Sequence, residues 1–160
     1  MADNSTLRSF GAAGHLHRLQ PIGPFTITPR VKREQERHGP PPYSAALRKA
    51  QDQNWIRLET PPGDLDTRAL MEWSKNLLSA TDAELLSWAR RANCFLFTND
   101  GPLIRAAKAL KVEAIDVVQT LLVLRENGHI DQTLRTKIVS DMEYHDNLAF
   151  KPAQREALHL

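Results

Sequence analysis

The sequence predicts an α/β fold, a three-layer α/β/α sandwich with a mostly parallel central sheet. Strand-like runs alternate with helical ones along most of the chain. The continuous apolar run at residues 94–97 is typical of a strand covered on both faces. Polar Thr98, Asn99 and Asp100 follow it, and Gly101 and Pro102 open the next helix. Ligands bind at this carboxyl edge of open α/β sheets, so an acid there is either a helix cap or part of a site.

Length and composition are those of one globular domain. The 160 residues are 41% hydrophobic and 25% charged, and the net charge of +2 permits a nucleic-acid partner without requiring one. Cys94 is the single cysteine, which excludes an internal disulfide, and its apolar run favours a small core residue. No apolar run reaches the ~20 residues of a membrane helix, and the first residues lack a secretory signature. We expect a cytoplasmic protein with no membrane partner.

Polar caps and apolar periodicity place the expected elements. Helices are expected after the capping cluster at 3–6, from Pro29 behind the N-cap Thr28, and at 44–53, 66–78, 103–110, 117–127 and 132–145, with a short terminal one. Strands are expected at 25–28, 55–58, 94–97 and 112–115, and a break at 39–42. Leu70, Trp73 and Leu77 are expected to share one side of their helix.

The run 81–84 matches a capping box, with Thr81 as N-cap and Glu84 reaching back to it. Apolar residues recur three, four and seven positions after Asp82. This spacing places Asp82 on the buried face of the first helical turn and rotates Glu84 away from it.

Four acids stand where carboxylates could face one cleft: Asp3, Glu34, Asp82 and Asp100. Taken singly, Asp3 and Asp100 are good helix N-caps, and Asp82 would complement a helix dipole. Glu34 would be a solvated helix residue. Taken together, Asp82 and Glu34 lie on apolar faces, where an unpaired carboxylate is costly. Like charges brought together there need a cation, and Mg²⁺ or Mn²⁺ suits hard oxygen ligands.

These residues resemble motifs of the PIN domain family, in the family's order over nearly the whole chain. Asp3-Asn4-Ser5 resembles its opening Asp-x-Asn or Asp-x-Ser motif, and residues 27–34 resemble its strand followed by Pro-x-Val-x-x-Glu. Residues 82–100 resemble its second half, in which an acidic helix start precedes an apolar strand ending in Thr-x-Asp. Gly128-His129-Ile130 and the terminal helices are similar to a prokaryotic subgroup with an extended carboxyl end.

The resemblance implies a metal-dependent ribonuclease of the kind found as VapC-like toxins of toxin–antitoxin pairs. Residues 1–128 would form the catalytic domain, and 129–160 a helical extension packed on it. The four acids would hold one or two Mg²⁺ or Mn²⁺ ions that polarise the scissile phosphate and activate water. Ser5, Thr98 and Asn99 would orient the carboxylates, although Thr98 could equally satisfy the end of its strand. An antitoxin partner and a homodimer are implied by the family alone.

Further residues could join this site. Asp116 ends a strand and is a possible fifth acid, but strand-end aspartates are also common turn residues. Basic side chains near the expected cleft would hold the RNA backbone, unless they are solvated helix faces: Arg30, Lys32, Arg33, Arg105 and Lys108. The six histidines show no zinc-ligand spacing.

The first strand departs from the family's pattern, because only Met1 and Ala2 precede Asp3. Either the chain begins late or the central strand is shortened, and a shortened strand is expected to leave unpaired backbone groups beside the site.

Two other functions stay open. A PIN-like module could bind RNA or a protein without catalysis. A doubly wound signalling domain could use strand-end acids for phosphoryl transfer, but it would need a lysine at the end of its last strand, and residues 112–116 offer none.

Overall fold

A computed structural model describes residues 1–38 and 41–160. Its elements run in the order α1 (Asn4–Ala12), the 3₁₀ helix η1 (Leu16–Ile22), β1 (Phe25–Ile27), α2 (Pro29–His38), α3 (Pro41–Asp52), β2 (Ile56–Leu58), α4 (Thr67–Trp73), α5 (Ala80–Ala92), β3 (Leu96–Phe97), α6 (Gly101–Ala109), β4 (Ala114–Ile115), α7 (Val117–Glu126), α8 (Gln132–His145) and α9 (Pro152–Ala157). The predicted α/β fold is confirmed.

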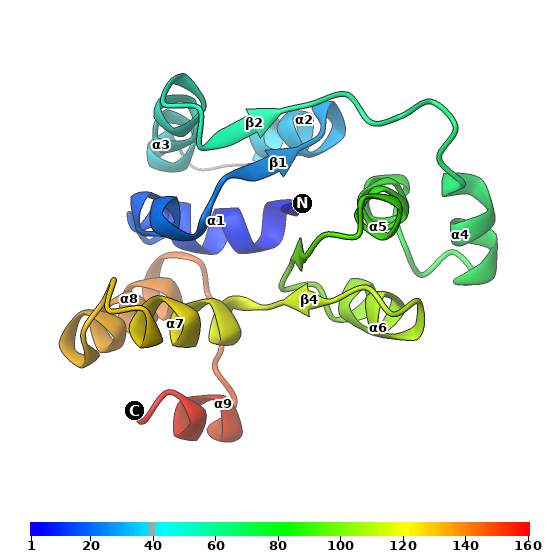
Figure 1. The fold of residues 1–160 in the computed structure, drawn as a ribbon. Coiled ribbons are helices and arrows are strands. Elements are labelled where there is room, and N and C mark those ends of the chain that lie inside the picture. The colour runs from blue at the N-terminus through cyan, green and yellow to red at the C-terminus, as the bar shows by residue number, and fades with distance from the viewer. Residues whose placement is uncertain (39–40) are drawn as a thin grey trace.

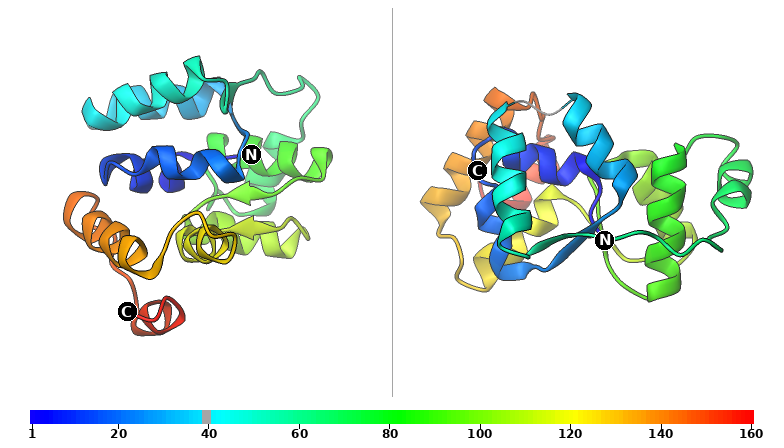
Figure 2. Two further views of the ribbon diagram at one scale, coloured as in Figure 1. Left: turned by 60° about the vertical axis from the view of Figure 1, so that its left-hand side comes forward. Right: turned by 90° about the horizontal axis from the view of Figure 1, so that it is seen from above.

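The strands are short and form two parallel pairs. β1 pairs with β2 so that Phe25 lies opposite Ile56, and β3 pairs with β4 so that Leu96 lies opposite Ala114. α4, α5 and α6 gather on one side of these strands, and α1, α3, α7 and α8 gather on the other (Figure 1). Figure 2 shows the same two groups from two further directions. This arrangement gives the three layers of an α/β/α sandwich.

The first three residues join the two strand pairs. The Ala2 N–H donates to the carbonyl of Thr26 in β1 at 2.9 Å. On the other side, the Asp3 N–H donates to Phe97 O at 2.9 Å and the Phe97 N–H donates to Met1 O at 2.8 Å. The expectation of unpaired backbone beside the site was therefore wrong. Even a bridge of one residue places Ala2 between β1 and β3, because its neighbours complete the ladder.

The core is continuous between the two helix layers. Its fully buried members include Leu7, Phe10, Leu85, Leu86, Leu96, Leu103 and Leu121. Gly11 lies within α1, where a Cβ would meet the ring of Tyr43 at only 2.0 Å. The glycine therefore serves this close approach of α3 to α1 and does not end the helix.

Several expectations about element boundaries were wrong, and β4 also begins two residues later than the strand expected at 112–115. β3 begins only at Leu96, so Cys94 precedes the strand and is half-buried, and Phe95 is 49% exposed. α4 ends at Trp73, which leaves Trp73 and Leu77 exposed while Leu70 is buried. α3 begins at Pro41, since proline is tolerated in a first helical turn. The rest of the predicted break, residues 39–40, lies outside the described residues.

Polar contacts join α8 and the residue that follows it to α1 and the start of η1. Asp141 of α8 accepts from the ring of His15 at 2.7 Å, and Asp146 pairs with Arg8 at 3.0 Å. The hydroxyl of Ser9 donates to Asp146 at 2.7 Å. The boundary predicted between 128 and 129 stays a prediction. Across residues 1–38 and 41–160, every helix is too short or too polar to cross a membrane.

Candidate active site

The carboxylate of Asp3 is buried at the start of α1, with 5% of the residue exposed. Its Oδ1 accepts from the backbone N–H of Asn4 at 2.5 Å. Its Oδ2 accepts from the N–H and hydroxyl of Ser5 at 3.3 and 2.6 Å, and from the hydroxyl of Thr98 at 3.0 Å. Asp3 is therefore both the N-cap of α1 and the centre of a polar network reaching the end of β3.

The same network continues to Asp100. Thr98 Oγ1 accepts from the Asp100 N–H at 3.1 Å, and Ser5 Oγ accepts from the Asn99 N–H at 2.8 Å. Asp100 Oδ1 then accepts from the Leu103 N–H at 2.7 Å, which makes Asp100 the N-cap of α6. The structure thus brings Ser5 and Thr98 to the acids through their side chains, and Asn99 through its backbone.

α5 begins two residues earlier than the capping pattern at 81–84 predicts. Ser79 is the N-cap: its hydroxyl accepts from the Asp82 N–H at 3.1 Å, and Asp82 Oδ2 accepts from the Ser79 N–H at 3.0 Å. The predicted box of Thr81 with Glu84 was wrong. Residues 79–82 carry the same Ser/Thr-x-x-Asp/Glu pattern, and this earlier start buries Leu78 just ahead of the cap.

Thr81 instead serves the second helix of the site. Its hydroxyl donates to Oε1 of Glu34 at 2.5 Å, which ties α2 to the first turn of α5 beside Asp82. Glu84 is not turned to solvent as expected: its side chain is only 12% exposed and accepts from Nε of Arg30 at 3.0 Å. Sequence reasoning assigned Thr81 no role at the site. The overlapping capping pattern that begins at Ser79 was the available signal, because a cap at Ser79 leaves the Thr81 hydroxyl free to contact Glu34.

The pKa of Asp82 depends on two of the other acids. Burial raises the pKa of its carboxyl, and the charges of Asp3 and Asp100 raise the pKa further, although the hydrogen bonds from Ser79 lower it. A half-buried carboxylate that faces two like charges is unfavourable without a counter-ion. Asp3, Asp82 and Asp100 therefore act as one electrostatic cluster.

The donor chemistry of this cluster fits Mg²⁺ or Mn²⁺, because carboxylate and hydroxyl oxygens are hard ligands. Within the described ranges, no three His, Cys, Asp or Glu side chains are grouped closely enough to hold a metal ion. Mg²⁺ usually keeps several waters and takes one or two carboxylates directly. The residues thus fit a hydrated ion on one or two acids, and the full four-acid ligand set stays a prediction.

The predicted RNA-binding cations divide into two groups. Arg30 is paired with Glu84, and Lys32 lies 3.8 Å from Glu36 on the same helix. Arg33, Arg105 and Lys108 are exposed. Arg105 lies over the start of α6: its Nη1 is 3.3 Å from the position that a Cβ on Gly101 would occupy. The Arg105 guanidinium therefore lies close to Gly101, the residue that follows Asp100.

Asp116 is the N-cap of α7, in a capping box with Gln119 at 2.8 and 3.0 Å. It lines a cavity of about 220 Å³ together with Asn99 and with Lys151 from the carboxyl-terminal segment. The structure thus explains Asp116 as a cap, and its role as a fifth acid stays a prediction.

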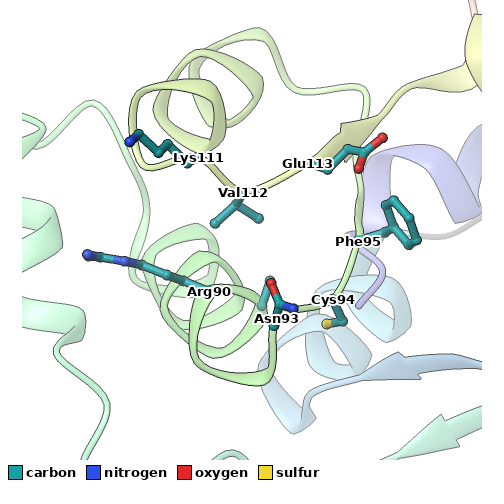
Figure 3. Close-up of a pocket in the computed structure, with 8 residues that line it drawn as sticks. Arg90, Asn93, Cys94, Phe95, Lys111, Val112 and Glu113 are labelled. Atoms are coloured by element: carbon teal, nitrogen blue, oxygen red, sulfur yellow. The ribbon is translucent and has the colours of Figure 1, made fainter.

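A cavity of about 270 Å³ lies at the opposite ends of β3 and β4, where Cys94 and Glu113 precede the strands. Figure 3 shows Arg90 and Lys111 on one side of Val112, with Phe95 and Glu113 on the other. The acids follow the strands at their carboxyl ends, so this cavity is separate from the acid cluster.

Comparisons with known proteins support the fold and the family. The crystal structure of PAE2754 from Pyrobaculum aerophilum is similar with a TM-score of 0.53 and 19% sequence identity, covering 87% of this chain and 95% of that one. A comparison with curated protein sequences finds no match. The sequence profile of a family described as PIN domain matches residues 1–156. The chain therefore belongs to the PIN domain family, whose members are generally nucleases that use divalent metals.

Proposed function

We propose that the protein is a metal-dependent endoribonuclease that hydrolyses phosphodiester bonds of RNA with Mg²⁺ or Mn²⁺. The observation that carries the proposal is the cluster of Asp3, Asp82 and Asp100, in which burial and like charge raise the pKa of Asp82. Such a cluster is unfavourable without a cation and favourable with one.

In this proposal one or two of Asp3, Asp82 and Asp100 bind the ion directly, and the remaining acids, with Glu34 from α2, contact it through its bound waters. Thr98 orients Asp3 by donating to its Oδ2, and Ser5 holds the same oxygen from the other side. A bound divalent ion supplies positive charge to the phosphate and lowers the pKa of an attacking water. Exposed Arg33, Arg105 and Lys108 hold the RNA backbone, which adds affinity without sequence choice.

The proposal includes a cytoplasmic toxin of the VapC-like kind, with an antitoxin partner and a homodimer. The family resemblance of the motifs and of the carboxyl-terminal helices supports it. Co-expression with the product of a neighbouring gene tests it: we expect a complex in which RNA cleavage is suppressed. A neighbouring product that neither binds nor inhibits would argue against a toxin role.

A second candidate is a PIN-like module that binds RNA or protein without catalysis. The observation that favours it is that the described part of the chain contains no group of three potential metal ligands. This module would bind RNA with an affinity that chelation does not change, and it would cleave none.

The deciding experiment is cleavage of a mixed pool of structured RNAs by purified protein. Parallel reactions contain Mn²⁺, Mn²⁺ with excess chelator, or the Asp100→Asn variant with Mn²⁺. Asparagine is as good an N-cap as aspartate, so the variant keeps the start of α6. We expect cleavage only by the unchanged protein with free Mn²⁺. Cleavage by Asp100→Asn at an unchanged rate would refute the proposed site.

A further inference from the structure

A third cavity, of about 270 Å³, is lined by the α4–α5 connection and by α6. Its wall consists of Trp73, Ser74, Lys75, Leu77, Leu78, Pro102, Arg105 and Ala106. We refer to it as the Trp73 cavity. Its volume is just below the ~300 Å³ at which small-molecule sites begin. It is therefore the size for one small planar group, and too small for a folded domain.

The Trp73 cavity adjoins the acid cluster through two segments of chain. Leu78 directly precedes Ser79, whose N–H is bound by Asp82 at 3.0 Å. Pro102, also in the cavity wall, is the second residue of the helix that Asp100 caps. The cavity wall thus includes one residue next to Ser79 and one two positions after Asp100.

The lining combines an aromatic surface with cations. Trp73 is 52% exposed and Leu77 is 70% exposed, which is unfavourable for such large apolar side chains without a partner. Lys75 and Arg105 lie in the same wall, and neither forms an ion pair within the described residues. Arg30, Arg68 and Arg91, by contrast, are each paired with an acid.

The turn that presents Leu77 is locally strained. Lys75 and Asn76 have φ values of 53° and 60°, a left-handed conformation that is unfavourable for lysine and tolerated better by asparagine. This left-handed pair turns the chain after α4 and places Leu77 in the cavity wall.

We propose that the Trp73 cavity binds one nucleotide of single-stranded RNA beside the scissile phosphate. The base stacks on Trp73 against Leu77, and the adjoining phosphates contact Arg105 and Lys75. Aromatic stacking with backbone-tracking cations is the usual chemistry of single-strand recognition. This inference rests on the proposed function, since it adds a subsite for one nucleotide beside the proposed active site.

The test measures RNA affinity in the Asp100→Asn background with Mn²⁺, using labelled single-stranded oligonucleotides that carry one abasic position in turn. We expect one position whose missing base weakens binding by about 5- to 150-fold, the effect of losing one stacked base. Trp73→Ala should weaken binding of the intact strand by the same factor and remove the dependence on that position. Trp73→Phe should recover part of the RNA affinity and part of the dependence on that position.

Tyr144→Ala is the matched control, because Tyr144 is 81% exposed on α8 and lies outside the cavity. This control should leave both the RNA affinity and the abasic profile unchanged. An abasic profile that Trp73→Ala also leaves unchanged would overturn the inference. So would a Trp73→Ala variant that changes only the oligomeric state in sedimentation and leaves RNA affinity intact. Failure of the unchanged protein to cleave RNA would refute the nuclease, whereas a Trp73-independent profile refutes the cavity alone.

Discussion

The two sides of the candidate site hold their carboxylates in different ways. On the side of α1 and β3, Asp3 is surrounded by donors from Asn4, Ser5 and Thr98. On the side of α2 and α5, Asp82 is held by Ser79 but carries a raised pKa from burial and neighbouring charge. The first side is satisfied by the protein itself, and the second leaves charge for a cation to neutralise. In the proposed nuclease, α1 and β3 would set the geometry of the site, and Asp82 would be the acid that a bound cation stabilises most.

The largest effect is expected at Asp3. In Asp3→Asn, the amide nitrogen replaces an oxygen that accepts hydrogen bonds, so a donor faces donors in a buried position. We expect the free energy of unfolding to fall by about 1–3 kcal/mol in urea titration, and RNA cleavage to be lost. Asp131→Asn is the control, since Asp131 is a helix N-cap at an exposed position and should change stability by only tenths of a kcal/mol. Equal losses of stability in Asp3→Asn and Asp131→Asn would show that the buried network around Asp3 adds nothing beyond helix capping.

Thr98 should have the next largest effect, because its hydroxyl connects Asp3 with Asp100. Thr98→Val removes the hydrogen bonds at 3.0 and 3.1 Å while keeping the shape of the side chain. We expect cleavage to fall by about 10- to 100-fold, as for other residues that orient metal ligands. Thr98→Ser should recover most of the rate. Similar rates for Val and Ser would mean that the hydroxyl only fills space.

Thr81 tests the second side of the site. Thr81→Val removes the donor to Glu34 at 2.5 Å, and Thr81→Ser keeps it. We expect about a tenfold loss of cleavage in the valine variant, the lower end of the range for orienting residues, because Glu34 stays on α2 and loses only its tie to α5. The rate of cleavage at several Mn²⁺ concentrations is the measurement. A loss that saturating Mn²⁺ does not reduce would place Glu34 outside the metal site.

The smallest effect concerns the charge of Asp82 in the absence of metal. A raised folded-state pKa means that the folded protein binds a proton more tightly than the unfolded chain. Stability therefore falls as pH rises from about 3.9 through the folded pKa, and the penalty is complete above it. Asp82→Asn should stabilise the metal-free protein at pH 7 by less than about 1 kcal/mol, because solvent screens this half-buried group.

The pH dependence supplies the check on that variant. In thermal unfolding with chelator, Asp82→Asn should be more stable than the unchanged protein at pH 7. At pH 3.5 the two should have nearly the same stability. With Mn²⁺ at pH 7 the order should reverse, because binding stabilises the unchanged protein more. A gain that grows toward acid pH would show that the pKa of Asp82 is lowered and not raised.

The sequence was informative wherever a local pattern decides the structure. Asp100 could be predicted as a strand-end acid because Gly101 and Pro102 start a helix directly after it. The contacts of Asp3 with Thr98 could not be predicted, since they join residues 95 positions apart and depend on how Ala2 pairs with Phe97. The paired state of Arg30 was also beyond the sequence, because Glu84 reaches it across two helices.

The start of α5 was predictable but ambiguous. Two overlapping capping patterns, at 79–82 and 81–84, fit the sequence equally well. The structure uses the first, in which Leu78 and Thr81 are buried. The exposure of Trp73 and Leu77 follows from the early end of α4, which helical periodicity cannot reveal. Sequence reasoning thus named the candidate acids, whereas the hydrogen bonds that connect Asp3 with Thr98 and Asp100 depend on tertiary packing.

The most direct test of the account is a calorimetric titration of the protein with Mn²⁺. The account predicts that Asp3, Asp82 and Asp100 surround one hydrated ion, with one or two of them bound to it directly. The unchanged protein should therefore bind Mn²⁺, and both Asp82→Asn and Asp100→Asn should weaken that binding at least about tenfold. Asp131→Asn, at an N-cap on α8, should bind as the unchanged protein does. Equal Mn²⁺ affinity in all four proteins would contradict a shared site at these three acids.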